Sequence, residues 1–172
     1  MMKSIKIFQT VLFVLALGCC TTVSAANKQK KADKDTDNWR YEIECAGTGA
    51  DGTYLVKVWS YSKKADLAAE QSLKNAVHGV LFKGITGQPG GCPSQRALIS
   101  TPNVQNEQRD FFAKFFSSNG GDFRKYAVAT GTPERVKLKK EYKVGVTVSV
   151  AKDQLRRDLE SAGVIKGLGS GF

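Results

Sequence analysis

The amino-acid sequence predicts an α+β fold, a two-layer sandwich with helices on one face of a mainly antiparallel, four-stranded sheet. Segments with a hydrophobic period of two occur in pairs separated by turn residues, which is the pattern of β-hairpins. Each pair is followed by a segment whose apolar residues fall on one helical stripe. The predicted order is strand, strand, helix, helix, strand, strand, helix. Antiparallel hairpins whose helices are segregated to one face pack most simply as two layers.

Residues 1–25 predict a secretory signal peptide. Lysines precede a short apolar run, residues 11–17, and small residues then lead to a cleavage site after Ala25. This run is much shorter than the roughly 20 apolar residues of a membrane-spanning helix, so we expect no transmembrane segment. The protein is therefore expected to be exported, to the periplasm or beyond. Processing as a lipoprotein at Cys19 is the alternative, and it would anchor the same fold to a membrane.

Residues 26–37 mix lysines with aspartates and contain no large apolar side chain, so we expect a disordered, charged leader. The pattern then changes to strict alternation of apolar and charged residues, which predicts a half-buried strand over residues 39–45. GTGADG, residues 47–52, is typical of a turn. Residues 54–61 are rich in β-branched and aromatic side chains on both faces, which predicts a second, more central strand.

From Lys64 the hydrophobic period becomes helical. Six apolar residues share one stripe and predict a long amphipathic helix that packs on the sheet: Ala69, Leu73, Ala76, Val77, Val80 and Leu81. Residues 84–93 form a loop by composition. A second helix is expected to begin near residues 101–103, to carry a series of phenylalanines and to end at residues 119–121, where two glycines follow an asparagine.

Residues 123–130 predict a third strand and residues 136–150 a long fourth strand. Apolar residues keep even positions throughout the latter segment, and a two-residue hairpin loop would reverse that parity, so one continuous strand is favoured. A short final helix with Leu155 and Leu159 on one face is followed by Gly163, a suitable left-handed cap. We therefore expect a single domain over residues 38–165 and a flexible tail over residues 166–172.

Cleavage of a signal peptide would leave two cysteines, Cys45 and Cys92. An even number of cysteines in an exported chain predicts one disulfide, which would contribute about 3–4 kcal/mol in the chain-entropy model. The alternative is a pair of free thiols, buried as small hydrophobic residues.

Part of the chain resembles a known family. An Ala-rich helix written AAEQSLKNAVHGVLF and a Val-rich strand that leads into KDQLRRDLESAG accompany the signal peptide and the first hairpin. Together they resemble the small envelope domains of the LPP20 and flagellar-assembly T N-terminal type, over residues 53–84 and 136–163. The resemblance implies a noncatalytic component of the bacterial envelope, and it carries over no functional residue.

The sequence contains no catalytic or metal-binding signature, and we expect no cofactor. His78 is the only histidine, and its place on an apolar helix is more typical of packing than of a catalytic base. One histidine and two cysteines do not make a tetrahedral zinc site, and the glycine-rich segments lack the features of a phosphate loop. The alternative function is an unrecognised hydrolase or thiol enzyme that uses Cys92 with His78.

The charge of the chain says more about a possible partner than these motifs do, because the formal net charge is +10. Four cations at odd positions of the expected long strand predict one basic face: Arg135, Lys137, Lys139 and Lys143. Such a face would attract an anionic envelope component or an acidic protein partner, and the absence of interleaved aromatic residues argues against nucleic acid. Alternatively, the lysines protect an exposed strand edge from aggregation. The sequence thus predicts an exported, noncatalytic envelope protein that acts as an interaction or accessory module.

Overall fold

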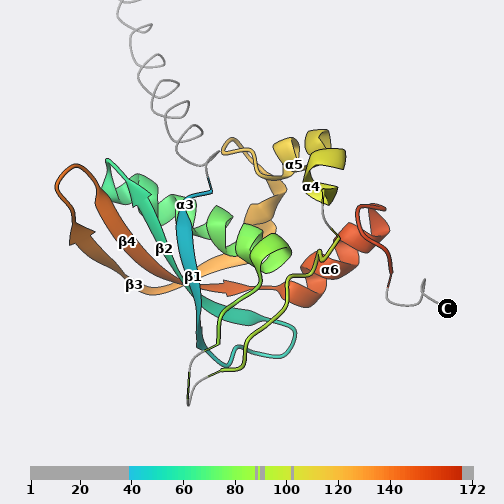
Figure 1. Ribbon diagram of the computed structural model, residues 1–172, viewed down its shortest axis with the longest axis horizontal. Coiled ribbons are helices and arrows are strands. Elements are labelled where there is room, and N and C mark those ends of the chain that lie inside the picture. The colour runs from blue at the N-terminus through green and yellow to red at the C-terminus, as the bar shows by residue number, and fades with distance from the viewer. Residues whose placement is uncertain (1–38, 88, 90–91, 102, 168–172) are drawn as a thin grey trace, which may run out of the picture.

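The computed structural model describes residues 39–87, 89, 92–101 and 103–167. The predicted signal peptide, the charged leader and the end of the tail lie outside the described residues. The remainder forms a four-stranded antiparallel sheet with helices, in the strand order β1-β2-β4-β3 (Figure 1). The predicted α+β class is therefore confirmed. The strands are β1 (Tyr41–Gly47), β2 (Tyr54–Ser62), β3 (Ala127–Lys137) and β4 (Tyr142–Val150).

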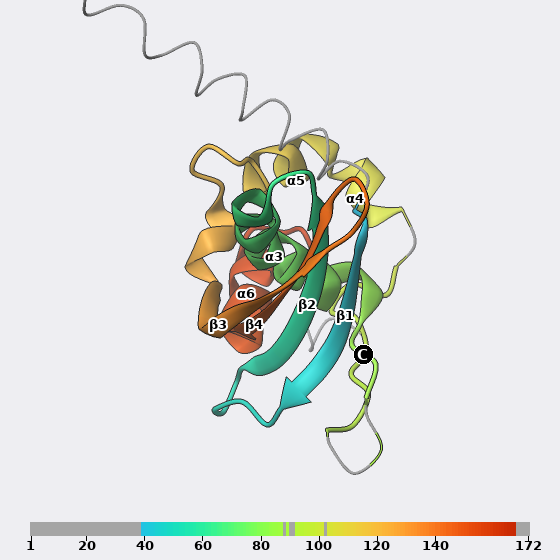
Figure 2. The same ribbon diagram turned by 90° about the vertical axis from the view of Figure 1, so that its left-hand side faces the viewer.

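The core lies between the sheet and helix α3 (Ala65–His78), which runs along one face of the sheet and continues as one π-helical turn, Gly79–Lys83 (Figure 2). Alternate residues of the two central strands point toward α3, as the period of two predicts. They form an almost fully buried layer of valines: Val56, Val58, Val144, Val146, Val148 and Val150. The expected long helix on the sheet is confirmed.

The second expected helix consists of two short helices, α4 (Val104–Glu107) and α5 (Arg109–Phe115), separated at Gln108. Both lie at one end of the sheet (Figure 2). Three phenylalanines of this region are buried, and their rings pack against those of His78, Phe82 and Tyr126: Phe112, Phe115 and Phe116. A 3-10 turn, Asp122–Lys125, follows, so the third strand begins at Ala127 instead of residue 123.

The final helix, α6 (Lys152–Ser161), buries Leu155 and Leu159 as expected. Gly163 has φ +70°, and its N–H donates to the carbonyl of Glu160, which confirms the predicted left-handed cap. None of the helices in the described part of the chain is both long enough and apolar enough to span a membrane.

The prediction of one strand over residues 136–150 is wrong. The chain reverses there, with the N–H of Leu138 bonded to the carbonyl of Glu141 at 2.8 Å, and β3 pairs with β4 as a hairpin. Val136 lies opposite Lys143, and residues directly opposite share a face, so the parity of β3 is the reverse of that of β4. Val136 and Leu138 therefore project from the face away from α3, where they are 45% and 37% exposed.

A disulfide joins Cys45 of β1 to Cys92 of the loop after α3, with a Cα–Cα distance of 6.1 Å, and confirms the predicted pairing. The same loop also runs beside β1, because the N–H of Cys45 donates to the carbonyl of Thr86 at 3.2 Å. The loop therefore covers part of an otherwise open sheet edge.

Candidate functional site

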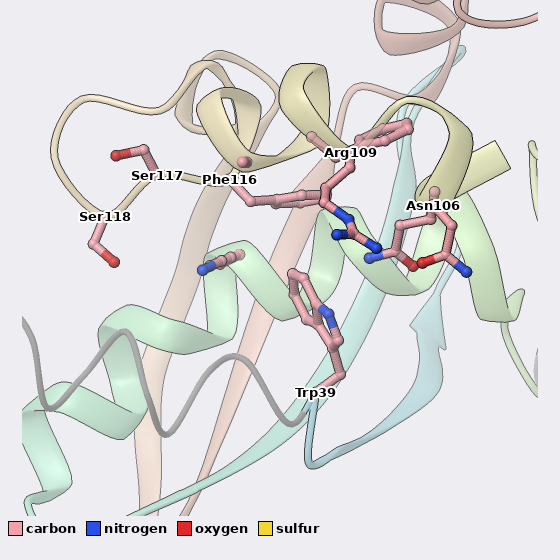
Figure 3. A pocket seen from close by; sticks show the side chains of 10 residues that line it. Trp39, Asn106, Arg109, Phe116, Ser117 and Ser118 are labelled. Carbon is pink, nitrogen blue, oxygen red and sulfur yellow. The ribbon is translucent and has the colours of Figure 1, made fainter. Parts of the chain in front are cut away.

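A groove of about 580 Å³ opens between the start of β1, helix α3 and the α4–α5 segment (Figure 3). We call it the aromatic groove. Its lining combines three aromatic rings, two cations and several uncharged polar side chains, and none of its described lining residues is acidic. Such a mixture can hold a ligand that has both an apolar part and a negative charge.

Trp39 forms one wall of the groove. Its ring stacks on that of His78 with centroids 3.6 Å apart and planes 16° apart, and Phe116 meets it edge-on at 5.0 Å. The backbone of Trp39 has φ +44°, in a region that large side chains seldom adopt. The aromatic contacts hold this conformation, so the position of the wall depends on them.

His78 and Tyr41 form a buried polar pair behind this wall, with 2.6 Å between the hydroxyl oxygen and Nδ1. Burial raises the pKa of Tyr41. Burial also lowers the pKa of His78, to about 3, and the positive charge of Lys83 contributes to this lowering. A side-chain hydrogen bond with Gln105 raises it, but by less than the other effects lower it. Both side chains are therefore neutral near pH 7. The Tyr41 hydroxyl then donates to Nδ1, which leaves the His78 proton on Nε2.

Two cationic side chains, Lys74 and Arg109, line the groove. The Lys74 side chain comes from α3, is only 8% exposed, and places its ammonium 5.3 Å from the centre of the Trp39 ring. Arg109 begins α5 and extends its guanidinium toward Trp39 from the other side (Figure 3). The Arg109 side chain is exposed, so it can attract an anion at this groove.

The four cations predicted to form one basic face do not share a face, and this expectation is wrong. Arg135 lies opposite Val144 on the face covered by α3, where it bonds Asp66 at 3.0 Å. Lys137 lies on that same face, opposite Tyr142, and Lys139 lies in the chain reversal. Lys143 projects from the other face. The cause is the hairpin, because it reverses the parity on which the prediction rested.

We call the face of the sheet away from α3 the open face. Three cations of the described open face form ion pairs: Lys143 with Glu42 at 2.8 Å, Arg40 with Glu141, and Lys57 with Glu134. The ring of Trp59 lies across Gly145, where an added Cβ would come within 2.7 Å of it. Because these charges are paired, they contribute little attraction for a separate anion.

Sequence reasoning missed the aromatic groove. It placed Trp39 in a strand and the phenylalanine series in a helix, but nothing in either pattern places them together. The four phenylalanines of FFAKFF, residues 111–116, fall within an arc of about 140° on a helix, as one buried face does, so they gave no separate signal of a groove. Of the residues that the sequence singled out, His78 is the one that the structure places beside the groove.

The described residues contain no group of three histidine, cysteine, aspartate or glutamate side chains that could hold a metal ion. Comparison with known proteins does not identify a relative: no protein-family model matches this chain, and no curated protein or solved structure matches it significantly. The resemblance to the LPP20 and flagellar-assembly T type therefore stays a prediction.

Proposed function

We propose that this protein is an exported, noncatalytic accessory module of the bacterial envelope, and that it binds a partner through the aromatic groove. The composition of the groove carries the proposal, because aromatic walls beside the exposed guanidinium of Arg109 favour binding of an anionic group with an apolar neighbour. The groove thereby replaces the basic strand face as the surface for an anionic partner.

The alternative, a thiol enzyme that uses Cys92 with His78, is less well supported. A nucleophilic cysteine must be a thiolate, whereas the sulfur of Cys92 is bonded to that of Cys45. His78 is only 4% exposed, and its Nδ1 is engaged by Tyr41. A general base needs to reach the substrate proton, and this imidazole is enclosed by aromatic rings.

The proposal can be tested with anilinonaphthalene sulfonate, a fluorescent probe that is both aromatic and anionic. The chain has two tryptophans, so Trp59→Phe leaves Trp39 as the only energy donor to the bound probe. We expect saturable energy transfer in this background and at least a tenfold weaker affinity after Arg109→Glu, since that change reverses a charge inside the groove.

Lys139→Glu is the matched control, because it makes the same change of charge in the β3–β4 reversal, and it should leave the affinity unchanged. Circular dichroism of each variant would show that the fold persists. The proposal would be contradicted if the Arg109→Glu variant bound the probe as tightly as the Trp59→Phe background does. It would also be contradicted if Trp39 transferred no energy to the probe.

A further inference from the structure

We infer that the hydroxyl of Tyr41 positions the Trp39 wall of the aromatic groove and thereby sets the affinity of the groove for its ligand. Tyr41 is not among the described residues that line the groove, so it acts as a positioning residue, through the imidazole of His78. This inference rests on the proposed function and deepens it, because it concerns how the free protein keeps one wall of the groove in the conformation that binds.

The backbone of Trp39 needs support from other residues. With φ +44° it lies in the left-handed region, which a large side chain occupies only when the surrounding structure imposes that conformation. Such strained residues cluster at functional sites. Here the strained residue is also the one that forms a wall of the groove, so the shape of the groove depends on the contacts that hold Trp39 in place.

Two successive contacts behind the wall hold it. The Trp39 ring stacks on the His78 ring with centroids 3.6 Å apart, and the Tyr41 hydroxyl donates to Nδ1 of His78 across 2.6 Å. Tyr41 and His78 are both buried. A buried hydrogen bond of this kind fixes the orientation of the imidazole, because the ring must keep Nδ1 directed at the hydroxyl to accept its proton. The bond therefore fixes the plane on which the indole stacks.

The end of α3 is shaped so that β1 can approach it closely beside His78. Gly79 follows His78 and begins the π-helical turn, a rare element that is frequent at functional sites. A Cβ at Gly79 would come within 2.5 Å of Cδ1 of Ile43 and 3.5 Å of the Tyr41 ring. Glycine at this position therefore lets β1 lie close enough for the hydroxyl of Tyr41 to reach the imidazole.

Lys83 ends the same π-helical turn and connects Trp39 to Tyr41 from a second side. Its Nζ lies 3.5 Å from the carbonyl oxygen of Trp39 and 3.8 Å from the centre of the Tyr41 ring, where the ring attracts the ammonium. The strained backbone, the buried hydrogen bond and the π-helical turn thus meet at one wall of the groove. This arrangement is expected of a preorganised site, which has less conformational freedom to lose when a ligand binds.

The test removes only the hydroxyl of Tyr41. Tyr41→Phe changes no charge at neutral pH, so a change in the affinity of the anionic probe reports the position of the wall. In the Trp59→Phe background we expect anilinonaphthalene sulfonate to bind at least threefold more weakly after Tyr41→Phe, because the competent position of Trp39 is then only partly populated. Without the probe, acrylamide should quench Trp39 fluorescence more strongly, since the indole leaves the stack part of the time.

Tyr54→Phe is the matched control. It removes a partly buried hydroxyl that donates to the side chain of Gln95 at 2.9 Å. Tyr54 begins β2, whose other end pairs with Tyr41, so the control lies at the far end of the sheet from the groove. We expect it to leave both the affinity and the quenching unchanged, and circular dichroism would show that each variant is folded.

His78→Phe tests the route by which Tyr41 acts. A phenyl ring can keep the stack on Trp39, but it cannot accept a hydrogen bond from the hydroxyl. When His78 has been replaced in this way, the additional change Tyr41→Phe should therefore not weaken the binding of the probe further.

Unchanged affinity after Tyr41→Phe, with the probe still bound in an Arg109-dependent manner, would overturn the inference and leave the proposed function standing. Equal weakening by Tyr41→Phe with and without His78 would show that the hydroxyl does not act through the imidazole, and it would also overturn the inference. If the probe does not bind before any of these changes, the proposed function is wrong, and the inference is wrong with it.

Discussion

The indole ring of Trp39 and the imidazole ring of His78 stack with centroids 3.6 Å apart, and this contact joins a residue two positions before β1 to the last residue of α3. Through it, one wall of the aromatic groove is attached to the helix that covers the sheet. The stability of the domain and the shape of the groove are thus coupled at this pair.

Replacement of Trp39 should therefore affect both properties. We expect Trp39→Ala to lower the free energy of unfolding by about 2–3 kcal/mol, since it removes the stack on His78 and the edge contact with Phe116. Trp39→Phe should cost less, because a smaller ring can keep part of the stack. Urea denaturation measures both values. Equal stability of the alanine variant and the wild type would show that the stack contributes nothing.

The buried state of His78 predicts a loss of stability in acid. Its pKa is about 3 in the folded protein and near 6.5 in the unfolded chain, so the unfolded state binds the additional proton as the pH falls. The contribution of neutral His78 to the free energy of unfolding is fully present above pH 6.5 and is lost progressively as the pH falls toward 3. Below about pH 5.5 the loss should approach about 1.4 kcal/mol per pH unit.

His78→Phe is the control for this prediction, because it keeps an aromatic ring in the cluster and removes the titration. Urea denaturation between pH 7.5 and about pH 4.5 should show a shallower pH dependence for this variant than for the wild type. Parallel pH profiles would mean that His78 does not titrate with a lowered pKa.

The Cys45–Cys92 disulfide should stabilise the domain through the loop that it closes. The two cysteines are 47 residues apart, so replacing both with alanine should lower the free energy of unfolding by about 3–4 kcal/mol. Peptide mapping without reductant should recover both cysteine peptides as one linked species. Two free thiols in oxidised material would disprove the bond.

The lysines near the β3–β4 reversal should act as surface charges that oppose aggregation. Lys137→Glu with Lys139→Glu should change stability by no more than about 0.5 kcal/mol, because both positions are exposed. β3 is an edge strand, and its Val136 side chain is exposed. Replacing both lysines with valine should therefore promote self-association, measured by sedimentation velocity, whereas the glutamate variant should stay as dispersed as the wild type. A monomeric valine variant would refute edge protection.

Export predicts a shortened mature chain. Cleavage after Ala25 would give a mature N-terminus at Ala26, whereas lipoprotein processing would give an acylated N-terminus at Cys19. Intact mass spectrometry of the protein purified from its native envelope fraction distinguishes the two, and we expect the first. An unprocessed chain that begins at Met1 would contradict both.

Features that depend on local periodicity and on composition could be predicted from the sequence. Alternation over residues 39–45 predicted β1, the apolar stripe from Lys64 predicted α3, and Gly163 marked the cap after α6. These patterns are reliable because backbone geometry alone decides which side chains share a face. The disulfide followed from the number of cysteines expected after export.

The β3–β4 hairpin and the aromatic groove could not be predicted, because both depend on contacts between residues that are apart in the chain. Even spacing of apolar residues could not reveal the hairpin, because Val136 and Leu138 remain exposed on the open face instead of entering the core. The aromatic groove brings Trp39 beside Arg109, residues far apart in the chain that no local pattern relates. A site of this kind forms only when separate elements pack together, since packing alone sets which side chains meet and how deeply each charge is buried.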